Sequence, residues 1–195
     1  MKKRTVRLVR RTAETDIKLV LSLDGAGRFS VSTGIGFMDH LLQTLARHGG
    51  FDLQLECRGD LQVDDHHTVE DCALVLGQAF DQALGERAGI ARFGFAYAPM
   101  DEALCRCVVD LSGRPFCLVD LGLSTERLGS LSCQNLAHFF RSFANAARCC
   151  LQLEVLRGEN DHHRAEAAFK ALALSLRAAV GLTRAGVPST KGVLG

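Results

Sequence analysis

The sequence predicts an α+β protein made of two internally duplicated halves, with helices sandwiched between two mixed β-sheets. The main observation is a repeated motif, His-His-x-x-Glu, which stands at residues 66–70 and again 96 residues later at 162–166. Each copy opens an apolar segment of helical period, and a glycine closes it 19 residues after the first histidine, at Gly85 and at Gly181. Each copy also follows a strand with the same four letters, Leu-Gln-Leu-Glu. A chain that repeats its elements in one order is internally duplicated.

Each half is expected to be of the βαβα type, with residues 1–88 as the first pseudo-repeat and 89–195 as the second. An amphipathic helix must cover its apolar side, and a sheet with one apolar face offers the surface for this. We therefore expect the two halves to bury each other's helices and to form one compact unit.

In the first half, alternating apolar and polar residues predict strands. Asp24-Gly25 is a strong turn signal, so a hairpin is expected there, with the alternation resuming at Phe29. Gly49-Gly50 ends the helix that follows. The expected elements are strands within residues 5–33, a helix over 37–47, a strand over 53–58 and a helix over 65–84.

The second half is expected to repeat this order. Residues 89–99 are expected to be only a connection between the halves. The expected elements are strands over 103–111 and 116–121, a helix over 132–148, a strand over 151–154 and a helix over 162–181.

Composition and charge exclude several classes of protein. The 195 residues are 47% hydrophobic and 23% charged, as in an ordinary globular protein. The net charge of +1 gives no electrostatic footprint for nucleic acid or an anionic membrane. Basic residues near the start alternate with apolar ones, which favours an exposed strand face over a polybasic tag. No apolar core of a signal peptide follows them, and no segment approaches about eighteen consecutive apolar residues.

The eight cysteines include no C-x-x-C pair. They fall in strand or helix patterns, so we interpret them as reduced packing residues of a cytosolic protein rather than as disulfides. Ligands for a metal are therefore expected to be histidine and glutamate.

The repeated motif has the chemistry of a metal site. In a helix, its first histidine and its glutamate (i, i+4) share a face. Each half also has one histidine near the start of its first helix. The eight candidate metal ligands are His40, His66, His67, Glu70, His138, His162, His163 and Glu166.

Adjacent helical residues point about 100° apart, so His66 and His67 are not expected to reach one ion together. The simplest division gives each of two ions three imidazoles and one carboxylate. Such ligands suit manganese, iron, nickel or zinc, and an octahedral ion would keep open positions for catalysis. The sequence leaves open whether the ligand sets meet within one chain or between neighbouring chains.

Four strings carry a resemblance to a known family that covers the chain from its first strand to its last residue. They are Gly34-Ile35-Gly36-Phe37-Met38-Asp39-His40, residues 64–71, residues 160–167 and Pro188-Ser189-Thr190-Lys191-Gly192. They resemble imidazoleglycerol-phosphate dehydratase of histidine biosynthesis, in its monofunctional form. The fold that this resemblance implies is similar to domain 2 of ribosomal protein S5.

The resemblance implies a lyase of the hydro-lyase class in the cytoplasm. Members of the family dehydrate D-erythro-1-(imidazol-4-yl)glycerol 3-phosphate to 3-(imidazol-4-yl)-2-oxopropyl phosphate in L-histidine biosynthesis. Two Mn²⁺ ions per active site hold the substrate ring as an imidazolate. The resemblance also implies a homo-oligomer, a shell of about twenty-four subunits built from trimers, with active sites between subunits.

The resemblance further implies roles for single residues. Glu14 is the expected proton acceptor, and His67 and His163 join it as catalytic residues. Asp65 and Asp71 are expected to cap the helix or orient the histidines. For His48, a substrate contact and an interaction with the helix dipole are equal alternatives. The full set of expected substrate-binding residues is Glu14, His40, His48, His66, Glu70, Arg92, Arg114, His162, Glu166, Lys170, Ser189, Thr190 and Lys191.

Two other functions compete with this hypothesis. A dinuclear metal hydrolase of another small phosphorylated substrate would use the same ligands. A protein that binds RNA or stores metal would need no substrate site, but the near-neutral charge and the open ligand sets disfavour it. We expect a small phosphorylated imidazole as the partner molecule, with no nucleic acid and no membrane.

Overall fold

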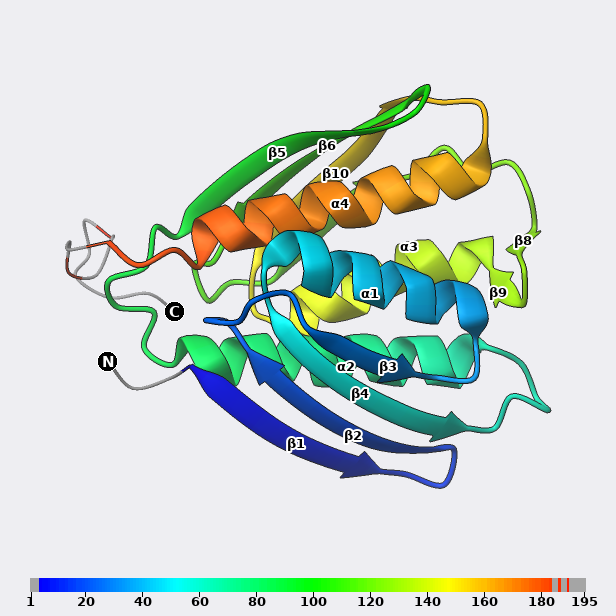
Figure 1. Ribbon diagram of the computed structural model, residues 1–195, viewed down its shortest axis with the longest axis horizontal. Coiled ribbons are helices and arrows are strands. Elements are labelled where there is room, and N and C mark those ends of the chain that lie inside the picture. The colour runs from blue at the N-terminus through cyan, green and yellow to red at the C-terminus, as the bar shows by residue number, and fades with distance from the viewer. Residues whose placement is uncertain (1–3, 184–185, 187–188, 190–195) are drawn as a thin grey trace.

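A layer of helices lies between two β-sheets in the computed structural model of the chain, which describes residues 4–183, 186 and 189 (Figure 1). Within those residues the first half contains β1 (Thr5–Arg11), β2 (Thr15–Ser22), β3 (Phe29–Ser32), α1 (Gly36–Gly49), β4 (Asp52–Gly59) and α2 (His66–Leu84). The second half contains β5 (Phe93–Met100), β6 (Ala103–Asp110), β7 (Phe116–Asp120), β8 (Arg127–Leu128), β9 (Leu131–Ser132), α3 (Cys133–Ala146), β10 (Cys150–Arg157) and α4 (Asp161–Ala179).

The two large sheets have the same topology. Their strand orders are β1-β2-β4-β3 and β5-β6-β10-β7. In each, the first two pairings are antiparallel and the last is parallel. The duplicated α+β architecture with mixed sheets is therefore confirmed. We keep residues 1–88 and 89–195 as the proposed pseudo-repeats, since α2 ends at Leu84 and β5 begins at Phe93.

Each sheet turns one apolar face toward the helix layer. In β2, Ile17, Leu19 and Leu21 are buried and alternate with less buried residues. In β6, Cys105 and Cys107 occupy the same kind of position. All eight cysteines are free thiols. Period-two alternation on the strands thus produces the two inner faces that the helices cover.

The helices contact the opposite half as well as their own sheet. Helix α2 packs on β1 and β2 and also against α3, whereas α4 packs on β5 and β6 and also against α1. Figure 1 shows α1 beside α4 in the middle layer. As a result, each helix that begins with the repeated motif lies beside the histidine-bearing first helix of the other half.

The hairpin expected at Asp24-Gly25 is wrong. The chain forms its first hairpin between β1 and β2. Strand β4 lies between β2 and β3, and β3 pairs parallel with β4 and not with β2. The Asp52 carboxylate accepts hydrogen bonds from the backbone N–H groups of Ala26 and Arg28. Tertiary contacts with β4 thus decide the path of this turn, and local turn propensity does not.

Residues 89–99 are more than the connection that the sequence predicted, because β5 occupies most of them. This strand alternates large and small residues, but the large ones face outward: Phe95 is 74% exposed, whereas Ala98 is buried. A Cβ on Gly94 would lie 2.0 Å from the Ser175 carbonyl oxygen. Small residues are therefore required where β5 lies on α4, which inverts the usual apolar pattern. The short β8–β9 hairpin was also not predicted.

The contact of α2 with α3 depends on Gly77. A Cβ at this position would lie 2.6 Å from the Phe143 carbonyl oxygen and 2.8 Å from the Ala147 backbone nitrogen. Backbone atoms cannot rotate away as a side chain can. The absence of a side chain at Gly77 thus sets how closely the two helices approach.

We predict that Gly77→Ala lowers the free energy of unfolding by about 1–3 kcal/mol, because the methyl group overpacks this contact. Gly36→Ala is the matched control, since it is also a helical glycine but its Cβ would meet nothing within 4 Å. Alanine's higher helix propensity should leave the stability of that variant unchanged or raised. Denaturant unfolding followed by circular dichroism measures both, and equal stabilities would contradict the proposed constraint.

Candidate metal centre

The structure brings six of the eight candidate ligands together in two groups. His40, His162 and Glu166 form one, called here the Glu166 group; His66, Glu70 and His138 form the other, the Glu70 group. In each group, one ligand atom per residue lies within 4.8 Å of the others. Because α1 packs against α4 and α2 against α3, each group takes members from both halves of the chain.

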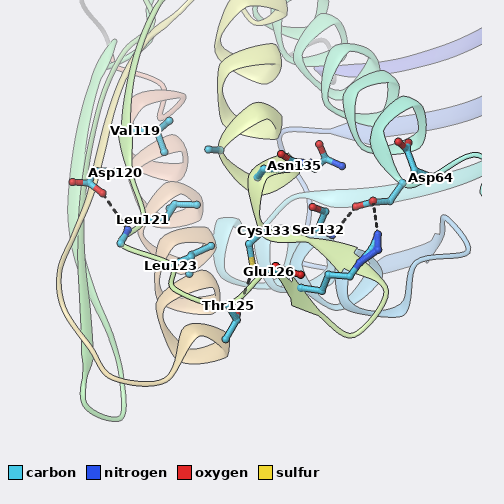
Figure 2. Close-up of a pocket in the computed structure, with 15 residues that line it drawn as sticks. Asp64, Val119, Asp120, Leu121, Leu123, Thr125, Glu126, Ser132, Cys133 and Asn135 are labelled. Carbon is cyan, nitrogen blue, oxygen red and sulfur yellow. Dashed lines mark hydrogen bonds and ion pairs between the residues drawn. The ribbon is translucent and has the colours of Figure 1, made fainter.

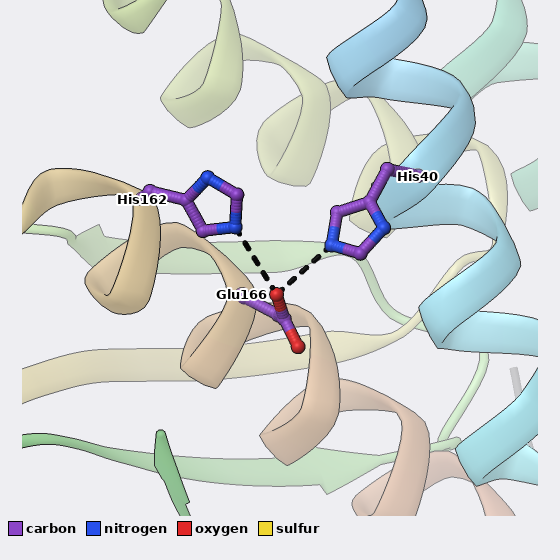
Figure 3. A group of neighbouring side chains, drawn as sticks. All are labelled: His40, His162 and Glu166. Carbon is purple, nitrogen blue, oxygen red and sulfur yellow. Dashed lines mark hydrogen bonds and ion pairs between the residues drawn. The ribbon is translucent and has the colours of Figure 1, made fainter. Parts of the chain in front are cut away.

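The Glu166 group converges on one carboxylate oxygen (Figure 3). Oε2 of Glu166 is 2.9 Å from Nε2 of His40 and 3.3 Å from Nε2 of His162. The other oxygen, Oε1, is 2.8 Å from Nζ of Lys170. Burial opposes ionisation of Glu166, but its hydrogen bonds with Lys170 and His40 outweigh burial and lower its pKa to about 2. The group therefore offers an ionised carboxylate.

In the Glu70 group, the two carboxylate oxygens face different rings. Oε1 of Glu70 is 3.0 Å from Nε2 of His138, and Oε2 is 3.9 Å from Nε2 of His66. Nδ1 of His66 is 3.1 Å from the side-chain oxygen of Asn135, so that Nε2 is the nitrogen turned toward the group. Asn135 was not predicted from the sequence; the available signal is its position three residues before His138 on the same helix.

Helix geometry and capping explain why the motif takes this form. His66 and Glu70, like His162 and Glu166, are four residues apart and share a helix face. The Asn160 side chain accepts a hydrogen bond from the backbone N–H of His162 at 2.9 Å, and Asp64 accepts one from His66 at 2.7 Å. These caps fix the first turn of each helix, from which the ligands project.

Asp65 acts on a histidine only indirectly, since it hydrogen-bonds Asn135, which holds the His66 ring, and Asp71 contacts no histidine. Asp65 accepts hydrogen bonds from the Ser132 backbone N–H at 2.7 Å and from Arg127 at 3.0 Å, and it makes no cap bond to its own helix. It therefore ties the start of α2 to the start of α3. Asp71 is buried and binds the Thr15 hydroxyl and the Arg10 guanidinium. Since Thr15 follows Glu14, this contact anchors the start of β2, directly after the turn that carries the expected proton acceptor.

His67 lies outside both groups. Its Nδ1 donates to Asp60 at 3.0 Å, because a carboxylate can only accept, and its Nε2 is 3.6 Å from Glu14. The hydrogen bond with Asp60 raises the pKa of His67. Asp60 was not predicted, and its only signal in the sequence is its place in the turn that follows β4.

His163 has a similar environment built from different elements. Its Nδ1 donates to Glu102 at 2.7 Å, which raises its pKa, and its Nε2 is 3.7 Å from Asp101. Glu102 also accepts from the backbone N–H groups of Asn160 and Glu159; these bonds, with that from His163, lower its pKa to about 2. Both second histidines of the motif thus keep Nδ1 occupied and leave Nε2 outside the groups of their own chain.

Within one chain, each group therefore has two imidazoles and one carboxylate, and not the three imidazoles of the simplest division. These donors fit a divalent ion. Two ligands at right angles on an ion about 2.1 Å away lie about 3.0 Å apart, close to the spacing between Glu166 and His40 or between Glu70 and His138. Three donors leave further positions for water, substrate or another ligand.

Of the expected substrate-binding residues outside the two groups, some lie near Glu166 and others lie far from it. His48, at the end of α1, lies near Lys170 and Glu166; partial burial and the charge of Lys170 lower its pKa. Arg92 lies far from Lys170 and Glu166. Its backbone N–H bonds the carbonyl oxygen of Ala179, and Ala179 lies about 20 Å from Glu166 along α4.

The side chain of Arg92 binds Asp110 at 2.7 Å and 3.0 Å. Arg114 is exposed in the loop before β7, which begins beside Cys149 at the far end of α3. Ser189 is described by the structure, whereas Thr190 and Lys191 lie outside the described residues. Arg92 and Arg114 are therefore not placed to reach a molecule bound at either group of their own chain.

A cavity of about 780 Å³ lies beside the Glu70 group, where the chain runs from β7 into α3 (Figure 2). Asn135, which holds the His66 ring, lines it together with Asp64 and Asp65. None of the six grouped ligands lines this cavity.

Among the described residues, no helix is long and apolar enough to cross a bilayer.

Comparisons with known proteins identify the family. A family model described as imidazoleglycerol-phosphate dehydratase matches residues 33–176. The chain is 52% identical to the enzyme of that name from Pyricularia oryzae, with 96% of each chain covered. It is 54% identical to the one from Salinibacter ruber, covering 98% of this chain and 96% of the relative. Another, from Phytophthora nicotianae, is 59% identical over 98% of this chain, which spans 42% of that protein.

Solved structures agree with the relatives. Imidazoleglycerol-phosphate dehydratase from Staphylococcus aureus superposes with a TM-score of 0.83 at 34% identity, covering 92% of this chain and 99% of that one. The enzyme from Pyrococcus furiosus, solved in complex with (S)-C348, gives 0.82 at 35% identity, covering 96% and 100%. The repeated motif, the duplicated fold and these matches agree, and the chain belongs to the imidazoleglycerol-phosphate dehydratase family of hydro-lyases.

Proposed function

We propose that this hydro-lyase dehydrates D-erythro-1-(imidazol-4-yl)glycerol 3-phosphate to 3-(imidazol-4-yl)-2-oxopropyl phosphate with two Mn²⁺ ions per active site. The observation that carries the proposal is the pair of groups, each with two imidazoles and one carboxylate. Nitrogen and carboxylate ligands without thiolate suit manganese. When bound, the two ions would supply positive charge beside the substrate's imidazole ring and favour loss of a proton from it. The comparisons give no support to a hydrolase of another phosphorylated substrate.

Glu14 is the proposed proton acceptor. Its carboxylate is half exposed, and its single charged neighbour among the described residues is His67, at 3.6 Å. The corresponding acid before β6, Glu102, is held by two backbone N–H groups and His163. A carboxylate that makes few fixed hydrogen bonds can accept a proton more readily than one that is fully bonded.

Lys170 and His48 are the proposed phosphate contacts on the chain that carries the Glu166 group. Both lie along the contact of α1 with α4, on the side of Glu166 that leads away from the start of α4. Arg92, Arg114, Ser189, Thr190 and Lys191 remain proposed phosphate contacts as well. Because Arg92 and Arg114 lie far from the groups of their own chain, we assign them to the site of a neighbouring chain.

The same reasoning applies to His67 and His163, the other proposed catalytic residues. Asp60 and Glu102 fix their rings so that Nε2 points away from the local groups. Each group has room for another donor, so we propose that a neighbouring chain supplies it. The active site would then require a homo-oligomer, for which we keep the expected shell of about twenty-four subunits built from trimers.

The outer faces of the two sheets favour such an assembly. That of the second sheet exposes six large apolar side chains: Phe93, Phe95, Tyr97, Val108, Phe116 and Leu118. The outer face of the first sheet carries mainly charged and polar residues, such as Lys18, Glu56 and Arg58. Large exposed apolar side chains gathered on one sheet face favour contact with another protein surface. We further propose a cytoplasmic location, where free thiols persist, and no nucleic-acid or membrane partner.

We predict that the purified protein holds two manganese ions per chain, and that a chelator removes both the ions and dehydratase activity. Reloading with manganese should restore the activity. His40→Ala and His138→Ala should each lose one ion, since they belong to different groups, whereas His48→Ala should keep both. Elemental analysis with an activity assay measures this. Full activity of the metal-free protein would contradict the proposal.

We predict that Glu14→Gln lowers kcat by about a hundredfold or more, the range expected for loss of a general base. The variant should keep its manganese, because Glu14 belongs to neither group. Asp16→Asn, a nearby exposed carboxylate paired with Arg11, serves as the control and should keep its turnover. An unchanged kcat for Glu14→Gln would remove this residue as the proton acceptor.

We predict that two inactive variants, His67→Ala and His40→Ala, recover activity when their metal-free chains are mixed and reloaded with manganese. In a mixed assembly, an intact Glu166 group from one chain can meet an intact His67 from another. Mixing His67→Ala with the double variant His67→Ala/His40→Ala provides the control, since it contains no intact His67. Failure to recover activity, with mixed oligomers shown by mass spectrometry, would mean that sites are not shared.

A further inference from the structure

The two groups differ in one charge, although the fold that carries them is duplicated. Oε1 of Glu166 is 2.8 Å from Nζ of Lys170, one helical turn along α4. The corresponding position in α2, four residues after Glu70, is Leu74. With neutral imidazoles, the Glu70 group therefore has a net charge of −1, whereas the Glu166 group and its lysine together are neutral.

The carboxylates beside the second histidines of the motif do not offset this difference. Each second histidine of the motif has a pair of carboxylates, Asp60 and Glu14 in the first half and Asp101 and Glu102 in the second. Because such a pair occurs in both halves, the pairs do not change the difference in net charge between the Glu70 group and the Glu166 group. The cation beside Glu166 occurs in one half alone. It sits beside a buried carboxylate, where a neighbouring charge is screened less than at the surface.

Lys170 also has a weak second contact that an anion could replace. Its Nζ is 3.0 Å from the thioether sulfur of Met100, which is a poor acceptor. A flexible four-carbon stem lets the ammonium group turn to a better partner. A phosphate near His48 and Lys170 would draw the ammonium group from Glu166 and leave both carboxylate oxygens to the metal.

We infer that the two metal groups are not equivalent: the Glu70 group binds its divalent ion more tightly, and phosphate strengthens binding at the Glu166 group by drawing Lys170 away from Glu166. This inference rests on the proposed function. Coupling between two ligands is reciprocal, so an ion at the Glu166 group strengthens phosphate binding by the same factor. Loading of the second ion and binding of the phosphorylated substrate would then support each other.

The test is a manganese titration of the metal-free protein, with free Mn²⁺ measured by electron paramagnetic resonance. The wild type should show two classes of site that differ by about tenfold or more in Kd, the effect of one nearby charge at intermediate dielectric. His138→Ala should lose the tighter class, and His40→Ala the weaker one. Inorganic phosphate should tighten the weaker class of the wild type and leave the tighter class unchanged.

Lys170→Met should tighten the weaker class without phosphate and abolish the phosphate effect, whereas Lys170→Arg should restore the wild-type difference. Leu74→Lys places the same charge beside Glu70 and should weaken the tighter class. Circular dichroism checks that each variant is folded, and the two Lys170 variants decide the question if Leu74→Lys does not fold.

Two sites of equal affinity for Mn²⁺, or a phosphate effect that persists in Lys170→Met, would overturn the inference while leaving the proposed function intact. Absence of any bound manganese would contradict the proposed function, and the inference with it.

Discussion

The contact between helices of opposite halves is the constraint on which the candidate metal centre depends. Each repeated motif supplies a histidine and a glutamate from one helix. The other histidine of each group, His40 or His138, comes from the other half of the chain. The groups exist because α2 packs against α3 and α4 against α1. Gly77 permits the close approach of α2 and α3, and Asp65 ties the starts of these two helices together. A fold with two sheets and a shared helix layer therefore turns a duplicated sequence into two groups of histidine and glutamate side chains that could each hold a metal ion.

The duplication also shows where the halves have diverged. Asp60 holds His67 from the turn after β4, which leaves Glu14 with few fixed contacts. In the second half, Glu102 takes the place beside the histidine ring and is bound by backbone N–H groups as well. The two halves therefore differ in this carboxylate: Glu14, the proposed proton acceptor, makes few fixed contacts, whereas Glu102 is held by several hydrogen bonds. Lys170 adds a second difference, because its counterpart in the first half is apolar. Pseudo-symmetry produces two groups of the same composition, and its local loss gives them surroundings with different charges and hydrogen bonds.

Local periodicity was sufficient to predict the duplicated fold and the four helices, and it placed the first histidine and the glutamate of each motif on one helix face. It could not predict which first helix would meet which motif, because that depends on packing between segments far apart in sequence. It failed for the turn at Asp24-Gly25, where hydrogen bonds to Asp52 override turn propensity. It also failed for β5, since close packing on α4 puts the small residues inside. The orientation of His67 and His163 follows from Asp60 and Glu102, carboxylates whose partners only the folded chain reveals.

The measurement that tests the central claim most directly is anomalous diffraction at the manganese edge from crystals grown with Mn²⁺. The account predicts two peaks per chain, one bound by His40, His162 and Glu166 and the other by His66, Glu70 and His138. It further predicts that each peak contacts His67 or His163 of a neighbouring chain. A peak shared by His66 and His67 of one chain, or no peak at Glu70 and Glu166, would contradict it.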